Sequence, residues 1–216
     1  MKVKISLFIL LLAPFVQVYS QLYIKHLTEN ENYVLVNKND TTHYLSKEYE
    51  RMLVNDNGLV SVCLNEKWGL INCKGEVVYP FKSNCAIGFT DGFASIEING
   101  KYGFINESLE TFVKPKYDLV FNIHEGFVSV CKNKKWGVMD SSGNLIIPVQ
   151  YDFIFEFYDG MAQVEFKNKF GYFNKKGKLA IPLKYDKADP YFKDGRAKVV
   201  LGGKTTFIDK NGEIIN

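Results

Sequence analysis

The chain has 216 residues, a formal net charge of +3, and 46% hydrophobic and 15% aromatic residues. This composition supports a substantial buried core and excludes a disordered chain. Nucleic-acid binders usually carry a basic excess concentrated on one face, so the near-neutral charge argues against nucleic acid as a partner.

The N-terminus has the pattern of a secretory signal peptide. Lys2 and Lys4 precede a largely apolar run from Ile5 to Val16, and Val18 and Ser20 occupy the positions that a signal peptidase reads. We therefore predict a signal peptide at residues 1–20, cleaved after Ser20. The alternative is a retained anchor helix, but its uninterrupted apolar stretch is short for the roughly 20 residues that span a bilayer.

Cleavage would leave a mature chain that begins at Gln21, with a net charge of +1 because two lysines leave with the peptide. The expected location is secreted, periplasmic or at the cell envelope, with no stable membrane insertion. An exported chain with four cysteines can form up to two disulfides in three pairings, and unpaired thiols are equally compatible. No two are spaced C-x-x-C, so neither a zinc nor a thioredoxin-like site is indicated. The four are Cys63, Cys73, Cys85 and Cys131.

One period of 34 residues governs the mature chain. Aromatic–glycine pairs recur at Trp68-Gly69, Tyr102-Gly103, Trp136-Gly137 and Phe170-Gly171. A second glycine series keeps the same spacing, with one extra residue before its last member: Gly58, Gly92, Gly126, Gly160 and Gly195. Such self-similarity is the signature of a tandem-repeat architecture.

Residues 126–160 represent one repeat. β-branched and aromatic residues predict three short strands. They are Phe127–Cys131, Trp136–Asp140 and Leu145–Ile147. Pro148 is expected to end the third strand because proline cannot donate to a ladder. The three-residue spacing of apolar side chains from Tyr151 onward favours a turn-like connector, and Asp159-Gly160 then forms a tight turn into the next repeat.

A single meander would expose its apolar face, so repeats must stack on their neighbours. The expected fold is all-β, with tandem three-stranded meanders stacked as an open β-solenoid-like array. A closed propeller-like ring is the alternative. Of six repeats, residues 21–48 form a degenerate N-terminal repeat or cap and residues 49–216 form the array. Thr205-Thr206 replaces the aromatic–glycine pair in the last repeat, as expected of an atypical end.

Two strings carry a resemblance to a known family. Lys134-Lys135-Trp136-Gly137-Val138-Met139-Asp140 and Ile147-Pro148-Val149-Gln150-Tyr151-Asp152 are similar to the consensus of the WG-repeat family, also called KWG repeats. The resemblance covers residues 49–216. It implies a bacterial exported protein whose repeats serve as structural or interaction modules and share no common chemistry.

A lysine precedes each aromatic–glycine pair, or the threonine pair of the last repeat. These lysines are Lys67, Lys101, Lys135, Lys169 and Lys204. Stacking would align them in a ridge that binds an anionic polymer or the acidic surface of a partner. The alternative, which we favour, is that they protect strand edges and lay their methylenes along neighbouring rings.

Other residue series have structural explanations. The repeated rings at Trp68 and its equivalents could stack on sugars, but their place beside glycine within a strand favours packing between repeats. The series of Asp118, Asp152 and Asp186 fits a turn or hydrogen-bond cap better than a catalytic pair. Three scattered histidines indicate neither a metal site nor a nucleophile–base dyad. They are His26, His43 and His124.

No catalytic motif is present, so we expect a non-enzymatic protein without a cofactor. The sequence predicts an interaction or scaffold module for an unidentified protein partner. The alternative is a cell-wall or polysaccharide-binding protein that recognises an envelope glycan.

Overall fold

A computed structural model describes residues 22–27 and 31–215, all of them in strands, turns or irregular segments. The predicted signal peptide at residues 1–20 lies outside the described residues. The chain divides into two compact units, Met1–Phe89 and Thr90–Asn216. No helix in the described part of the chain has the length and apolar character needed to cross a bilayer.

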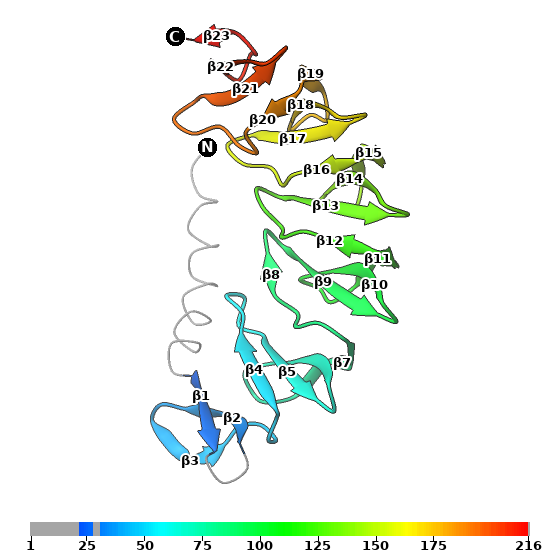
Figure 1. Ribbon diagram of the computed structural model, residues 1–216. Coiled ribbons are helices and arrows are strands. Elements are labelled where there is room, and N and C mark those ends of the chain that lie inside the picture. The colour runs from blue at the N-terminus through cyan, green and yellow to red at the C-terminus, as the bar shows by residue number, and fades with distance from the viewer. Residues whose placement is uncertain (1–21, 28–30, 216) are drawn as a thin grey trace, which may run out of the picture. The chain divides into compact units, whose positions relative to one another are not determined.

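The described strands form six antiparallel sheets, one with three strands and five with four (Figure 1). The first unit holds β1 (Leu22–Leu27), β2 (Asn32–Asn37) and β3 (Asp40–Tyr44) in one sheet, and β4 (Arg51–Val54), β5 (Val60–Leu64), β6 (Lys67–Ile71) and β7 (Val77–Ser83) in the next. The division between the units falls within β8 (Phe89–Thr90), which belongs to the sheet of β9 (Phe93–Ile98), β10 (Lys101–Asn106) and β11 (Thr111–Tyr117).

Three further sheets of the second unit follow in chain order. One contains β12 (Leu119–Val120), β13 (Phe127–Lys132), β14 (Lys135–Asp140) and β15 (Leu145–Tyr151). The next contains β16 (Phe153–Ile154), β17 (Met161–Phe166), β18 (Lys169–Asn174) and β19 (Leu179–Tyr185). The last contains β20 (Lys187–Ala188), β21 (Ala197–Leu201), β22 (Lys204–Ile208) and β23 (Ile214–Ile215).

The connector was predicted to be turn-like, and this prediction was wrong. Phe153 and Ile154 form β16, which pairs with Glu165 and Val164 of the following repeat. Ile154 is fully buried, so its side chain contributes to the core while its backbone is satisfied by the ladder. The connector therefore provides the first strand of the next sheet, and the five sheets after the first have four strands instead of the expected three.

The third strand also differs from its prediction. β15 continues through Pro148 to Tyr151, because the pairing with β14 is irregular at this point. Val138 is opposite Ile147 and Trp136 is opposite Tyr151, so the bulge takes up the residues between them. β15 is the edge strand of its sheet, where a proline without an N–H is tolerated.

This bulge explains the glycine of the aromatic–glycine pair. A Cβ on Gly137 would lie 2.7 Å from the carbonyl oxygen of Ile147. The equivalent glycines face the same obstacle, at 2.7 Å for Gly69, 2.6 Å for Gly103 and 2.5 Å for Gly171. Glycine is thus required by the close approach of the bulged third strand in the same sheet, whereas the sequence pattern had linked it to packing between repeats.

Within the second unit the cores form between neighbouring sheets. Trp136, Val138 and Ile147 of one sheet share a buried cluster with Ala162 and Val164 of the next. In the first unit a corresponding cluster contains Leu35 of β2 together with Met52 and Val62 of β4 and β5. All four cysteines are free thiols, and burial is the main factor that raises the pKa of Cys63 and Cys131.

Candidate binding groove and the lysine row

The five lysines of the predicted ridge each begin the second long strand of a repeat. Lys101 pairs with Asp118 at 2.5 Å, and Lys135 and Lys169 make the same ion pair with the aspartate 17 residues ahead. Lys67 donates to the side chain of Asn84, and Lys204 lines a small cavity of about 470 Å³ beside the last sheet. The lysines that form ion pairs remain about half exposed.

Each paired aspartate also binds the next repeat. The second carboxylate oxygen of Asp118 accepts the backbone N–H of Asn133 at 2.7 Å, and that of Asp152 accepts the N–H of Lys167 at 2.7 Å. These bonds lower the pKa of both aspartates and of Asp186. The hydrogen bond from the lysine has the larger effect and the backbone hydrogen bond the next largest. The aspartates therefore connect one hairpin tip to the next, which agrees with the prediction of a hydrogen-bond cap.

The rings of the aromatic–glycine pairs pack against the core, and those of Tyr102 and Phe170 are only partly buried. Trp68 and Trp136 are buried, and Trp136 stacks on Phe121 with ring centroids 4.6 Å apart. Phe153 contacts the same indole edge-on at 5.5 Å. These contacts fill the space between repeats, so the indole of Trp136 is not available for stacking on a sugar.

A second row of polar residues lies at the other end of the hairpins, where tight turns lead into β13 and β17. His124 and Phe127 exchange both backbone hydrogen bonds around the two-residue turn of Glu125 and Gly126. Both turn residues have positive φ, 53° and 81°, the conformation that favours an acidic or asparagine residue followed by glycine. The sequence predicted a tight turn at Asp159-Gly160, and this turn has the same conformation, with φ of 50° and 79°. The turn at Glu125-Gly126 was not predicted.

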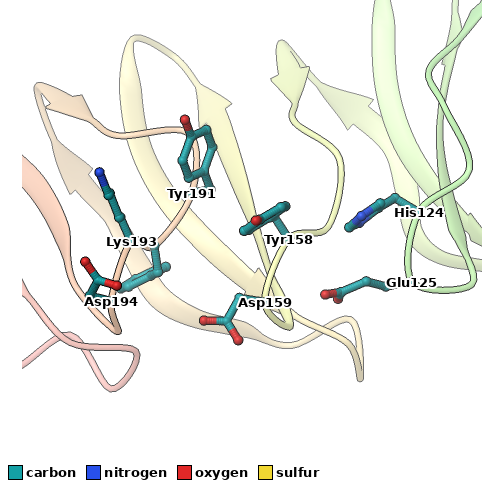
Figure 2. A pocket seen from close by; sticks show the side chains of 8 residues that line it. His124, Glu125, Tyr158, Asp159, Tyr191, Lys193 and Asp194 are labelled. Atoms are coloured by element: carbon teal, nitrogen blue, oxygen red, sulfur yellow. The ribbon is translucent and has the colours of Figure 1, made fainter.

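Turns of three successive repeats border a groove of about 690 Å³, within the size range of ligand sites in proteins. It is lined by His124, Glu125, Tyr158, Asp159, Tyr191, Phe192, Lys193 and Asp194. Figure 2 shows the rings of His124, Tyr158 and Tyr191 in one row and the three carboxylates in a second row beside it.

The rings of this groove contact one another but remain accessible. His124 and Tyr158 are nearly parallel, with centroids 5.6 Å apart, and Tyr158 and Tyr191 are 5.3 Å apart at 48°. The two tyrosines are 47% and 45% exposed, in contrast to the buried tryptophans. Nδ1 of His124 lies 2.7 Å from the carbonyl oxygen of Phe157. Since a carbonyl only accepts, Nδ1 carries the proton, and in the neutral ring Nε2 is an acceptor.

Backbone hydrogen bonds fix Glu125 of the carboxylate row and Asp91, its equivalent one repeat earlier. The carboxylate of Asp91 accepts the N–H of Gly126 at 2.7 Å, and Oε2 of Glu125 accepts that of Gly160 at 3.0 Å. Two lysines flank the row, since Lys175 lies 3.1 Å from the same oxygen of Glu125 and Lys210 lies 2.6 Å from Oδ2 of Asp159. The groove is therefore built from turns that fix one another in position.

Sequence reasoning did not assign the groove residues a role, although two signals pointed to them. The residue before each acidic–glycine turn differs among repeats: it is Thr90, His124, Tyr158 or Lys193. The extra residue before Gly195 lies in the last connector, where Tyr191 precedes the buried Phe192 and its ring reaches Tyr158. In the described part of the chain, no group of three or more histidine, cysteine or acidic side chains is arranged to hold a metal.

Four-stranded sheets that repeat every 34 residues, with interlocking aspartates and buried aromatic–glycine pairs, define a tandem-repeat β protein. A family model described as WG containing repeat matches residues 68–102, 102–136, 136–170 and 170–204. The chain belongs to this family, which confirms the resemblance noted in its sequence.

The search of curated proteins found no match. Among solved structures, a eukaryotic initiation factor is similar with a TM-score of 0.49 and 12% identity, over 92% of this chain and 62% of that one. Apo AztD from Citrobacter koseri has a TM-score of 0.47 and 10% identity, over 91% of this chain and 68% of that one. Hsv2p from Kluyveromyces lactis has a TM-score of 0.41 and 9% identity, over 77% of this chain and 62% of that one. The chain spans less than two-thirds of the Hsv2 structures, and these TM-scores are too low to establish a shared fold.

Proposed function

We propose that this protein is an exported, non-enzymatic interaction module that binds a partner protein in the groove between His124 and Asp194. The observation that carries the proposal is the contrast in ring exposure. The rings of the aromatic–glycine pairs are buried or partly buried against the core, whereas Tyr158 and Tyr191 are nearly half exposed beside a groove. Half-exposed tyrosines in a concave site are typical of protein recognition surfaces.

The lysine ridge is a weaker candidate for the same role. Lys101, Lys135 and Lys169 are already paired with aspartates that connect the repeats. An anionic ligand would have to compete with these partners. We therefore place the binding function in the groove and assign the lysines to the stability and solubility of the array.

Capture from an envelope extract tests this assignment. Tyr158→Ser with Tyr191→Ser should abolish capture of the proteins that the unmodified chain retains, because both exposed rings are lost. A second variant, with Lys101, Lys135 and Lys169 changed to Ser, should retain them. Loss of capture in the lysine variant alone would move the binding site to the ridge.

The alternative function is cell-wall or polysaccharide binding. It is favoured by the presence of exposed tyrosine rings next to carboxylates, which also suits sugars. Retention of the protein on insoluble peptidoglycan or on a polysaccharide panel, sensitive to the tyrosine substitutions, would replace the protein partner by a glycan.

The proposal includes export and an open arrangement of the repeats. The signal peptide pattern at residues 1–20 supports export, with a mature protein that begins at Gln21. Atypical first and last repeats support an open stack over a closed ring, since a ring needs no caps. Chemical cross-links between residues 22–36 and 195–216 would indicate a closed ring.

A further inference from the structure

The groove offers more hydrogen-bond acceptors than donors. Glu125 uses Oε2 for both Gly160 and Lys175, and Asp159 uses Oδ2 for Lys210. Within residues 22–27 and 31–215, the other oxygen of each carboxylate has no hydrogen-bond or ion-pair partner, and neither has the carboxylate of Asp194. When the ring of His124 is neutral, its Nε2 adds another acceptor, because Nδ1 donates to the carbonyl of Phe157.

Donors are fewer among the groove-lining residues. Lys193 contributes an ammonium group, and the hydroxyls of Tyr158 and Tyr191 can donate or accept. The lining residues therefore carry three carboxylates against one lysine. Lys175 and Lys210 pair with Glu125 and Asp159, so with Lys193 the formal charges around the groove balance at three lysines against three carboxylates. One oxygen each of Glu125 and Asp159 and the carboxylate of Asp194 are left to accept hydrogen bonds. A suitable ligand is therefore rich in donors, and a cationic donor would form a charge-assisted bond with Asp194.

The rings narrow the choice of cation. Tyr158 and Tyr191 lie beside the carboxylate row, as Figure 2 shows, and each is nearly half exposed. A guanidinium group is planar, stacks on tyrosine rings and donates up to five hydrogen bonds, so it satisfies both rows at once. An ammonium group lacks the stacking surface. A sugar hydroxyl can also donate to a carboxylate, but it carries no charge, so its hydrogen bond to Asp194 would lack the charge assistance that a guanidinium provides.

The chain of turns also indicates the form of the ligand. Acidic residues repeat along the groove at Glu125, Asp159 and Asp194, one from each repeat, and the rings run parallel to them. A ligand that uses several of these positions must carry several cationic groups along its length. An extended polypeptide segment with more than one arginine meets this requirement.

We infer that the groove binds an arginine-bearing extended segment of the partner protein. This inference rests on the proposed function, since it names the chemistry that the groove recognises. Arginine side chains would lie over the tyrosine rings and donate to the accessible oxygens of Glu125, Asp159 and Asp194.

Fluorescence anisotropy with labelled synthetic peptides tests the inference directly. Four peptides of alternating glycine and a second residue would carry arginine, lysine, serine or glutamate at that position. The arginine peptide should bind more tightly than the lysine peptide, the other two should not bind, and added salt should weaken the interaction. Equal affinity for arginine and lysine, or no binding of the arginine peptide, would overturn the inference.

Variants locate the interaction. Asp159→Asn with Asp194→Asn should weaken arginine-peptide binding by about tenfold or more, since each lost charged acceptor removes a charge-assisted bond. Tyr158→Leu should reduce the preference for arginine over lysine. The matched control is Asp56→Asn with Glu107→Gln, which removes the same charge from exposed positions outside the groove. An equal loss in the control would reduce the effect to net charge and contradict the inference.

A saccharide arm separates this inference from the proposed function. One outcome is that chitin oligosaccharides bind, that Tyr158→Leu weakens their binding, and that the arginine peptide does not bind. The groove would then still be a binding site, but for a saccharide and not for an arginine-bearing segment. If the extract experiment captures proteins through the groove while the arginine peptide fails, the interaction role remains and only the arginine assignment falls.

Discussion

The two ends of the long hairpins are made of the same kinds of residue but do different work. At one end, a lysine recurs in each repeat, and in three repeats it binds an aspartate that also binds the next repeat. At the other end, the turns recur but the residues beside them change from repeat to repeat, and rings and carboxylate oxygens remain accessible. Positions that recur build the array, whereas positions that vary within a constant frame give it a specific surface.

The largest effect expected from this comparison concerns the two kinds of aromatic residue. Trp136→Ala should lower the free energy of unfolding by about 3–5 kcal/mol, because it leaves a cavity where the indole stacks on Phe121. Tyr158→Ala, at an exposed ring, should change it by less than about 1 kcal/mol. Urea unfolding monitored by circular dichroism gives both values. Similar losses for the two variants would contradict the division between packing rings and groove rings.

A smaller loss is expected at the recurrent glycine. Gly137→Ala places a Cβ against the carbonyl of Ile147, which should cost about 2–3 kcal/mol through forced backbone shifts. Thr206→Ala at the equivalent position of the last repeat is the control, since a Cβ is already accommodated there, and it should be nearly neutral. Thermal unfolding of the two proteins checks the difference. A neutral Gly137→Ala would show that the bulged third strand can move away.

The smallest effect concerns pH at the lysine–aspartate end. Asp118, Asp152 and Asp186 have lowered pKa values in the folded state. Stability due to them is present above their ordinary pKa of 3.8 and is lost as pH falls through the lowered folded values, because the unfolded chain binds protons first. Unfolding midpoints measured from neutral pH downward should therefore fall below about pH 4.

Asp152→Asn sharpens this prediction. The variant should be less stable than the unmodified protein at neutral pH, and its stability should depend less steeply on pH in the acid range. Asp56→Asn, at an exposed aspartate that connects no hairpins, serves as the control. An unchanged acid slope in Asp152→Asn would show that the ion pair with Lys135 adds nothing to the array.

The sequence predicted the features that depend on local chemistry and strict spacing. The period, the tight turn at Asp159-Gly160 and the packing role of Trp136 all follow from residue types at regular positions in the repeat. The connector strand at Phe153 was missed because a two-residue strand has no periodicity of its own and exists only through its partner in β17. β15 was predicted too short because Pro148 ends a central strand but is tolerated at a bulged edge.

The groove was less accessible to sequence reasoning. The groove depends on side chains that the repeat pattern does not predict. Tyr191 is an example, because its position follows from a single extra residue in the last connector. Accessibility is a property of the folded arrangement, and the same type of residue is buried at Tyr172 and exposed at Tyr158. Comparing the positions that differ among repeats would have selected His124, Tyr158 and Lys193, without showing which of them face a cavity.

In this array each connector supplies the first strand of the following sheet, and this affects how such arrays can become longer. The chain passes from one sheet into the next through a connector strand such as β12 or β16. A duplicated block of 34 residues therefore contains both a connector strand and a hairpin with which such a strand pairs. Gene duplication at this period therefore adds a complete sheet without creating a new type of contact. Repeats can therefore be added as units, and substitutions in a single turn can change the binding surface without altering the contacts between repeats.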